Sequence, residues 1–349
     1  MRTGPLAALA GACALTVTVT ACAPVRENET DTLVVSTFSF ATEDFERVIA
    51  EPFEERTGIR VILDTGNNAT RLTKLRINRE HPDTDVVLIS DYFAAIGEEM
   101  GLFEKVDPAA VPNMAEIQPW AVDPDGYGPA YTFQLLGVMY RTDLVEEPPA
   151  SWDALWDPEH PGGFALPDIS VSAGPLMVLA AGEAYGSGPT DADTGFERLA
   201  EIGPDALQFY SRSTEVSSLL ERGEIAMAPS LDNFAMEAVA SGQPIGFAVP
   251  ERGRLMTANT AQIVRDAPNR AGAEAFIDFL LEPEVQSEVA QVIYDKPVHP
   301  DAEVTDLMLQ VSGDAAVDPA GNGYRQGDPD LIAAERSAWL DRYVEEIER

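Results

Sequence analysis

The apolar and polar positions of residues 32–101 fall into alternating blocks that predict strands and helices in turn. Residues 33–37 are a short, partly β-branched run typical of a strand. Residues 86–89 are a continuous apolar run, as expected of a parallel strand buried on both faces. Apolar residues recur at helical spacing after Thr42 and again after Asn67, and both residue types are common at helix starts. This alternation of strands and helices indicates α/β architecture.

The rest of the chain continues the pattern. Residues 135–140 are apolar around Gly137, and we expect this strand to leave one lobe and enter another. Since one hydrophobic core rarely serves more than ~250–300 residues, a chain of 349 residues predicts more than one. Further strands are predicted at residues 164–166, 225–228, 245–249 and 259–264, and further helices at residues 152–156, from Ser213 or Thr214, and around Phe276.

Polar and aromatic side chains cluster where three of the predicted strands end. In α/β sheets, ligands bind beyond the carboxyl ends of the strands, so these clusters are candidate binding residues. They are Phe38, Ser39 and Phe40 after the first strand, Asn67 after the second, and Ser90, Asp91 and Tyr92 after the third.

The first residues are similar to an export signal. Arg2 precedes an apolar stretch that ends at Val19 and is too short for the ~20 residues of a membrane span. The following Thr20-Ala21-Cys22 resembles the bacterial lipobox, in which the cysteine is acylated after cleavage. We expect residues 1–21 to be a lipoprotein signal peptide and residues 22–31 to be a tether anchored by lipid at Cys22. The alternative is an ordinary cleaved signal with a chance cysteine.

Charge and cysteine content narrow the range of partners. The formal net charge of −36 argues against nucleic acid as a partner, because nucleic-acid binding needs a basic face. The acidity indicates either a solvated surface suited to high salt or a field that draws cationic solutes. No disulfide is expected, since Cys13 lies within the signal and Cys22 would be acylated.

The chain offers little for catalysis. It has three histidines, and two of them, His81 and His160, stand beside prolines in predicted turns. It holds no nucleophilic serine in a Gly-x-Ser-x-Gly motif, no phosphate-cradling glycine loop and no paired-histidine metal motif. We therefore expect no catalytic residue, no metal site and no cofactor. A secreted hydrolase is the alternative of another class.

Four stretches resemble the polyamine (spermidine/putrescine)-binding proteins of ABC importers. They are SWDALWDPEHPGGFALPD (151–168), FYSRSTEVSSLLERGEIAMAP (209–229), NTAQIVRDAPNRAGAEAFIDFLLEPEVQ (259–286) and FEERTG (53–58). The segment at residues 338–342 is also similar to the last helix of that family. The LLEPEVQ segment is shared with families that bind iron, thiamine and phosphonates. Together the stretches cover nearly the whole mature chain.

The resemblance implies a type II periplasmic-binding-protein fold. Two α/β lobes, each a mainly parallel sheet flanked by helices, would be joined by two crossover hinge strands. Lobe 1 would take residues 32–135 and about 257–302, and lobe 2 residues 136–256 and about 303–349. A solute that touches both lobes would favour the closed state. The implied protein is an extracytoplasmic, lipid-anchored monomer on the outer face of the cell membrane, which passes a small solute to an ABC permease.

The resemblance also implies contacts beyond the strand-end clusters. Tyr131 and Phe133 lie in the crossing strand, and we expect one in the core and the other facing the cleft. Tyr92 is either a contact or the first inward residue of its helix. Asp168 ends a strand, where a carboxylate would either pair with a protonated amine or cap a helix. The remaining candidates are Ser170, Asp232, which is open to the same two interpretations, and Asn259.

The chain departs from the polyamine binders at two places. Pro229 and Ser230 stand where such proteins often have a tryptophan, and residues 256–258 lack a tryptophan and an acid expected before Asn259. We expect the ligand to be a polyamine or a related cationic amine, with a different amine or no amine left open. A receptor of the same fold for ferric iron, thiamine or a phosphonate is the alternative. For ferric iron, Phe209-Tyr210 offers one phenol where adjacent tyrosines are usual.

Overall fold

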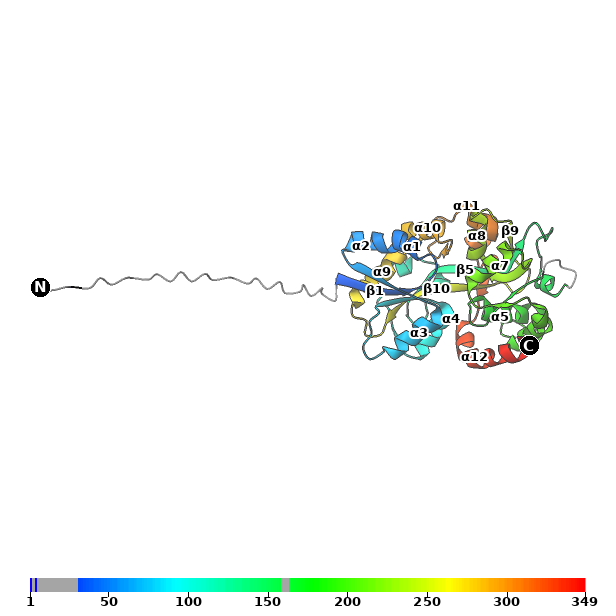
Figure 1. The fold of residues 1–349 in the computed structure, drawn as a ribbon, viewed down its shortest axis with the longest axis horizontal. Helices are drawn as coiled ribbons and strands as arrows, with labels where there is room; N and C mark the ends of the chain where they lie inside the picture. Colours follow the sequence, from blue (N-terminus) through cyan, green and yellow to red (C-terminus); the bar gives the residue numbers. More distant parts are fainter. Residues whose placement is uncertain (2–3, 5–30, 158–162, 349) are drawn as a thin grey trace.

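The chain forms two lobes joined by long strands. The computed structural model describes residues 1, 4, 31–157 and 163–348. Cys22, His160 and most of the predicted signal peptide and tether lie outside the described residues. In Figure 1, the elements of residues 32–99 gather on the left and those of residues 166–248 on the right, while β5 (Ala130–Arg141) and β10 (Leu255–Val264) run between them. This is the two-lobed α/β arrangement that the sequence predicts.

The sheet of lobe 1 is mixed rather than mainly parallel. Its strands β2 (Arg60–Thr65), β1 (Thr32–Thr37) and β3 (Val86–Ser90) run parallel. By contrast, β10 lies antiparallel between β3 and β5, and β11 (Lys296–Pro297) pairs antiparallel with β5. The reason is the crossover: β10 returns from lobe 2 and so runs against β3, whose carboxyl end points toward lobe 2.

The strand β5 changes partners where it passes between the lobes. Its first half, up to Leu135, pairs with β10 and β11. From Leu136 onward it pairs on its two sides with β8 (Met227–Leu231) and β9 (Ile245–Ala248), both antiparallel. The parallel strands β6 (Leu166–Pro167) and β7 (Phe209–Tyr210) form a separate pair. Lobe 2 is thus not mainly parallel, because β5 enters it as a central strand of opposite direction. The strand predicted at residues 225–228 begins two residues later.

Helices cover the faces of both sheets. Lobe 1 carries α1 (Thr42–Phe45) and α2 (Glu51–Thr57), joined by a π-helical turn at Glu46–Ala50, then α3 (Asn68–Ile77), α4 (Asp91–Glu99), α9 (Arg270–Leu280) and α10 (Pro283–Val292). Lobe 2 carries α5 (Ala173–Tyr185), α6 (Ala192–Ile202), α7 (Ser213–Glu221), α8 (Asp232–Ala240), α11 (Asp306–Ser312) and α12 (Pro329–Arg342). Two short strands, β4 (Phe103–Glu104) and β12 (Arg325–Gln326), pair with β10. None of the helices in the described part of the chain has the length and apolar composition that crossing a membrane requires.

Each lobe has its own aromatic core. In lobe 1, Phe53 of α2 packs edge to face against Phe276 and Phe279 of α9, with ring centroids 5.1 and 5.6 Å apart. In lobe 2, Phe196 of α6 packs against Trp339 of α12 at 5.7 Å. Edge-to-face pairs stabilise beyond the area that they bury. The two cores hold the sheets rigid, and so fix the strand ends that meet between the lobes.

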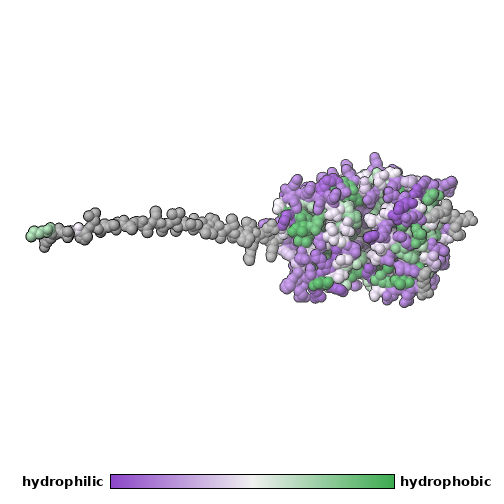
Figure 2. Space-filling view, in the orientation of Figure 1, coloured by the Kyte–Doolittle hydropathy of each residue, from purple (hydrophilic) through white to green (hydrophobic). Residues whose placement is uncertain are grey.

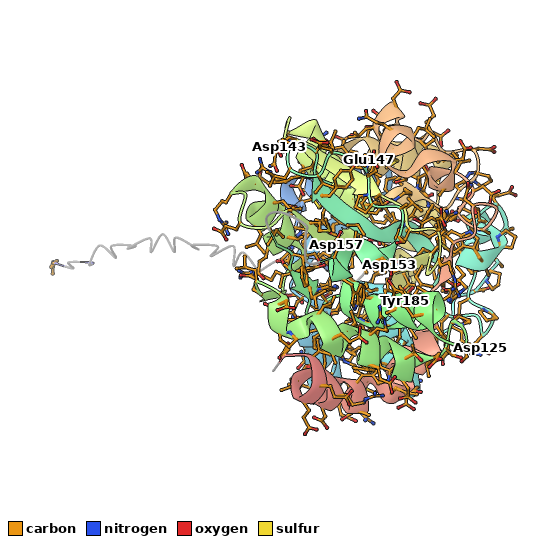
Figure 3. The ribbon with its side chains drawn as sticks, turned by 90° about the vertical axis from the view of Figure 1, so that its right-hand side faces the viewer. Asp125, Asp143, Glu147, Asp153, Asp157 and Tyr185 are labelled. Carbon is orange, nitrogen blue, oxygen red and sulfur yellow. The ribbon has the colours of Figure 1, made fainter. Side chains whose placement is uncertain are left out.

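Acidic side chains are spread over the surface. Figure 3 shows Asp143, Glu147, Asp153 and Asp157 distributed over one side of the molecule, and all four are exposed. Figure 2 shows a largely hydrophilic face with scattered apolar patches. Charges placed in this way are solvated individually and also sum to a long-range negative field. The surface therefore agrees with both interpretations of the net charge.

A cavity of about 260 Å³ lies at α4 and the amino end of α12, and several carboxylates line it. Glu98 shares this cavity with Asp123, Asp125 and Asp330. Burial, and then the charges of these aspartates, raise the pKa of Glu98 to about 7. The native state therefore binds more protons than the unfolded chain between the ordinary pKa of 4.5 and about 7.

Replacing Glu98 by glutamine is expected to raise the free energy of unfolding at pH 8 by about 1 kcal/mol. The effect is small because solvent screens the charge of this partly exposed group. The parent protein loses stability as pH rises through 7, since the native state then holds a charge in unfavourable surroundings. At pH 4 the parent carboxyl is protonated and the two proteins should agree. Urea denaturation at both pH values measures this, and an equal effect at pH 4 and pH 8 would contradict it.

Candidate functional site

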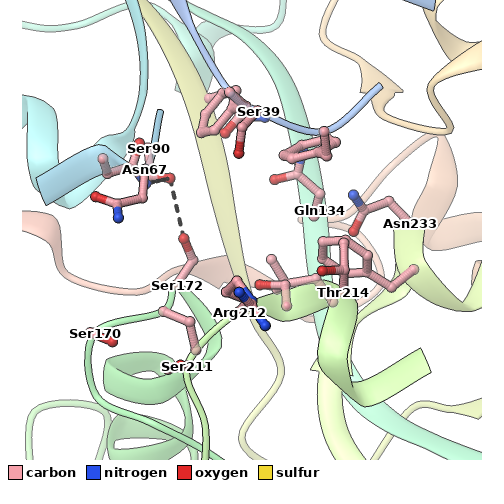
Figure 4. A pocket seen from close by; sticks show the side chains of 18 of the residues that line it. Ser39, Asn67, Ser90, Gln134, Ser170, Ser172, Ser211, Arg212, Thr214 and Asn233 are labelled. Atoms are coloured by element: carbon pink, nitrogen blue, oxygen red, sulfur yellow. Dashed lines mark hydrogen bonds between the residues drawn. The ribbon is translucent and has the colours of Figure 1, made fainter. Parts of the chain in front are cut away.

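A main cavity of about 290 Å³ opens between the lobes at the strand ends (Figure 4). Its wall comes from both lobes, and its volume lies near the lower end of the ~300–1,000 Å³ typical of small-molecule sites. Lobe 1 contributes residues 38–40 and 66–69, Ser90, Gln134 and Asn259. Lobe 2 contributes residues 170–172 and 211–214, Leu231, Asn233 and Phe234.

The wall brings together about half of the residues predicted from the sequence. Those in the wall are Phe38, Ser39, Phe40, Asn67, Ser90, Ser170 and Asn259. Those that lie outside it are Asp91, Tyr92, Tyr131, Phe133, Asp168 and Asp232. Ligand contact by any of them stays a prediction.

Asp91 and Tyr92 pack inside the protein at the start of α4. The Asp91 carboxylate accepts hydrogen bonds from Thr257 Oγ1 at 2.8 Å and from the Ala258 backbone N–H at 3.0 Å, which ties α4 to β10. Burial raises the pKa of Asp91 to about 6, although these hydrogen bonds lower it. Tyr92 is buried, with its ring centroid 4.4 Å from that of Phe93, as the inward-residue interpretation expects.

Tyr131 and Phe133 both lie in the core of lobe 1. They are 5% and 0% exposed and belong to one hydrophobic cluster. The expectation that one of them faces the cleft stays a prediction. Tyr131 lines a small neighbouring cavity together with Phe38 and Phe40. Gln134, the residue after Phe133, points the other way and lines the main cavity.

Asp168 and Asp232 have partners within the protein. The Asp168 carboxylate accepts a hydrogen bond from the Ser170 backbone N–H at 2.7 Å and so shapes the loop before α5. Asp232 is fully buried, forms an ion pair with Lys296, and accepts a hydrogen bond from the Leu135 backbone N–H at 3.0 Å. Each of these two carboxylates therefore has a hydrogen-bond or ion-pair partner within the protein in the absence of a ligand.

Several wall residues were not identified from the sequence. They include Gln134, Ser172, Arg212, Thr214 and Phe234. The helix predicted to be capped by Ser213 or Thr214 has Arg212 as its N-cap, one residue earlier. The start of α7 could have indicated Arg212 and Thr214, because a loop that follows a strand and leads into a helix lies at the edge of the sheet where ligands bind.

A buried arginine organises the lobe 1 wall. The Arg71 guanidinium donates to the carbonyl oxygens of Gly66, Ser36 and Leu88 at 3.0, 3.2 and 2.6 Å. Gly66 directly follows β2, Ser36 is the last residue but one of β1, and Leu88 is in the middle of β3. Arg71 also donates to Asn68 Oδ1 at 2.8 Å and stacks 4.7 Å above the centroid of the Phe38 ring. Burial lowers its pKa to about 10, so it remains charged at neutral pH.

Hydroxyl groups bridge the two lobes. Asn68 Nδ2 donates to Ser90 Oγ at 2.9 Å, and Ser90 Oγ lies 3.2 Å from Ser172 Oγ across the cleft (Figure 4). Aromatic rings form a second bridge, in which Phe40 lies 6.1 Å from Phe234 of lobe 2. The lobes therefore touch on opposite sides of the main cavity, and a molecule within it contacts both.

The residues present do not favour a metal. Within the described residues, no group of three or more His, Cys, Asp or Glu side chains is arranged to hold a metal ion. The wall instead offers hydroxyl groups, amides and aromatic rings. This chemistry binds a small organic solute by hydrogen bonds and packing.

Comparison with known proteins identifies relatives. Residues 48–311 match the family model of the bacterial extracellular solute-binding proteins. The spermidine/putrescine-binding periplasmic protein of Salmonella typhimurium is 24% identical over 308 residues, which cover 86% of this chain and 87% of that protein. The gamma-aminobutyric acid-binding protein of Pseudomonas aeruginosa is 25% identical over 285 residues, which cover 79% of this chain and 80% of that protein.

The fold is also shared with solved structures. An ABC transporter structure from Clostridium perfringens has a TM-score of 0.75 and 28% sequence identity, and the match covers 90% of this chain and 99% of that one. The family match spans most of the chain and includes both crossing strands. The chain therefore belongs to the bacterial extracellular solute-binding proteins, which bind a small solute for an ABC permease and are not enzymes.

Proposed function

We propose that this protein captures a small cationic amine, a polyamine or a related amine, in the main cavity. The observation that carries the proposal is the wall, which combines aromatic rings with hydroxyl and amide oxygens from both lobes. Such oxygens accept hydrogen bonds from an ammonium group, and the rings pack against an alkyl chain or attract a cation. The named ligands of the two relatives above, spermidine, putrescine and gamma-aminobutyric acid, share a primary amine.

We also propose that the chain is exported and anchored to the membrane by lipid at Cys22. The lipobox-like sequence supports this anchor, and residues 22–31 supply a polar tether. The net charge of −36 supports a role in drawing cationic solutes toward the cleft. On this proposal the protein acts as a monomer, with lobe 1 and lobe 2 meeting near residues 135 and 257.

A thermal-unfolding panel tests the ligand class. A bound amine is expected to raise the Tm, because a ligand at 100 times its Kd stabilises the folded state by about 2.7 kcal/mol. The panel contains spermidine, putrescine, gamma-aminobutyric acid, thiamine, a phosphonate without an amine, and ferric iron. A Tm shift with thiamine or ferric iron and none with any amine would replace the proposed ligand class.

Replacing Phe40 by alanine is expected to raise the Kd of the amine about tenfold, equivalent to about 1.4 kcal/mol. Phe40 is half-buried, and its ring lies 5.4 Å from Phe38 and 6.1 Å from Phe234, so it contributes to the wall of the cavity and to the contact between the lobes. Calorimetric titration measures the change. Ile62→Ala, on the exposed side of β2, is the matched control and should bind normally. An unchanged Kd for Phe40→Ala would remove this ring from the binding site.

A further inference from the structure

The wall of the main cavity carries no carboxylate among the described residues, although the whole chain is strongly acidic. Its one charged side chain within that part of the chain is Arg212. Two acids stand directly behind the wall, but their partners are internal: Asp91 binds the Ala258 N–H, and Asp232 pairs with Lys296. A diamine in this cavity would therefore bury two positive charges without a facing carboxylate, which is costly.

A third acid, Asp295, lines a small neighbouring cavity with Phe38 and Phe40 and does not line the main cavity. Asp295 is buried and accepts hydrogen bonds from Asn259 Nδ2 at 3.2 Å and Thr132 Oγ1 at 3.3 Å. Asn259 lines the main cavity and stands between it and this carboxylate. Burial raises the pKa of Asp295 to about 6, which further weakens it as a counter-ion in mildly acidic surroundings.

Five helices begin at the wall. The residues preceding α3, α4, α5, α7 and α8 all line it: Asn67, Ser90, Ser172, Arg212 and Leu231. A helix amino end carries a partial charge of roughly +0.5 and N–H groups without an intrahelical acceptor. Neither Ser172 nor Leu231 caps its helix with a side-chain hydrogen bond. Converging helix ends of this kind favour an anionic oxygen group.

An unpaired amide gives independent support. Asn233 is 5% exposed and lines the cavity (Figure 4), and its Oδ1 has no hydrogen-bond partner in the described part of the chain. Asn233 is the second residue of α8, so this oxygen stands at one of the converging helix ends. A buried polar atom without a partner is destabilising, so a ligand is expected to donate a hydrogen bond to this oxygen. The ammonium group of the ligand supplies that donor, while the helix N–H groups are left for an anionic group.

We infer that the ligand carries an anionic oxygen group, a carboxylate or a phosphonate, in addition to its amine. This inference rests on the proposed function for the amine. The anionic group lies among the helix amino ends beside Arg212, and the ligand is thus a zwitterion rather than a diamine. The Arg212 guanidinium is 77% exposed and forms a salt bridge of 2.8 Å with Glu215 of its own helix. An anion in the cavity would compete with Glu215 for this exposed group.

Four probes of similar length test this inference by calorimetric titration of the full mature protein. They are 4-aminobutyrate, 3-aminopropylphosphonate, 1,4-diaminobutane and butyrate. We expect 4-aminobutyrate or 3-aminopropylphosphonate to bind at least about tenfold more tightly than 1,4-diaminobutane. The tighter of the two identifies the anionic group. Equal or tighter binding of 1,4-diaminobutane overturns the inference and leaves the proposed function standing.

The remaining outcomes separate the inference from the function on which it rests. If butyrate binds as tightly as 4-aminobutyrate, the ligand needs its anionic group but not its amine. The inference is then supported, and the proposed function, which requires an amine, is contradicted. If no probe binds, the inference fails, and the proposed function fails with it unless spermidine raises the Tm. Arg212→Gln is expected to weaken the anionic probe about tenfold and to leave 1,4-diaminobutane unchanged. Arg222→Gln, at the exposed carboxyl end of α7, is the matched control and should bind every probe normally. An equal loss for both probes in Arg212→Gln would contradict a contact with the anion.

Discussion

Replacing Lys296 by methionine is expected to lower the free energy of unfolding by about 3–5 kcal/mol. Lys296 and Asp232 form an ion pair in which both side chains are 0% exposed. Burial lowers the pKa of Lys296, and the charge of Asp232 counteracts this. Without the ammonium group, Asp232 would remain as a buried charge with no counter-ion. This uncompensated charge is the source of the expected loss.

The pair also stands at the junction of the lobes. Lys296 lies in β11, and Asp232 is the first residue of α8 in lobe 2. The same carboxylate accepts hydrogen bonds from the Leu135 N–H, where β5 crosses, and from Ser312 Oγ at 2.6 Å. We therefore expect this cluster to set the position of α8, and with it Phe234 in the wall of the main cavity.

Urea denaturation measures the Lys296 effect. The double variant Lys296→Met/Asp232→Asn should recover part of the loss, since the amide carries no charge and its oxygen still accepts from the Leu135 N–H. Arg222→Ala breaks an exposed pair with Glu224 and is the control, for which little change is expected. A loss in Lys296→Met no larger than that of the control would show that the buried pair is not needed for stability.

The elements that the sequence predicts well are those whose pattern is local. Residues 86–89 are apolar at every position and form β3, buried throughout. Asn67 precedes α3 and caps it by accepting a hydrogen bond from the Thr70 N–H at 2.8 Å. The rule that ligands bind beyond the carboxyl ends of strands needs only local information as well, and it predicts residues 38–40 and Ser90 as wall residues.

The features that the sequence does not reveal depend on register and on distant partners. The register of β5 against β10 places Gln134 on the cavity side, and a shift of one residue would have turned Phe133 toward the cavity instead. The Asp232–Lys296 pair joins positions far apart in the chain. An isolated carboxylate in a sequence looks the same whether it faces a ligand or a buried lysine. For this reason the sequence alone leaves Asp91, Asp168 and Asp232 as candidate ligand contacts, and the structure adds an internal hydrogen-bond partner for each.

The partners of Arg71 are likewise not revealed by the sequence, and Arg71 affects the binding site more than the candidate acids do. It is 2% exposed and lies within α3, where the pattern suggests an ordinary helix residue. Its guanidinium binds carbonyl oxygens in or directly after three parallel strands, whose ends carry much of the lobe 1 wall. Arginine suits this place because its planar group donates in several fixed directions at once. Arg71 is thus a positioning residue for Asn68 and Phe38 rather than a ligand contact.

Replacing Arg71 by methionine is expected to lower the free energy of unfolding by at least about 3 kcal/mol, because three backbone carbonyls lose a donor. Ligand affinity should fall more than about tenfold at temperatures where the variant is folded, since Asn68 and Phe38 lose their support. Arg71→Lys should recover little, as one ammonium group cannot reach acceptors on three strands. Lys74→Met, one turn further along α3, breaks a partly exposed pair with Asp64 and should leave both properties nearly unchanged. Full ligand affinity in folded Arg71→Met would show that the strand ends keep their positions without this arginine.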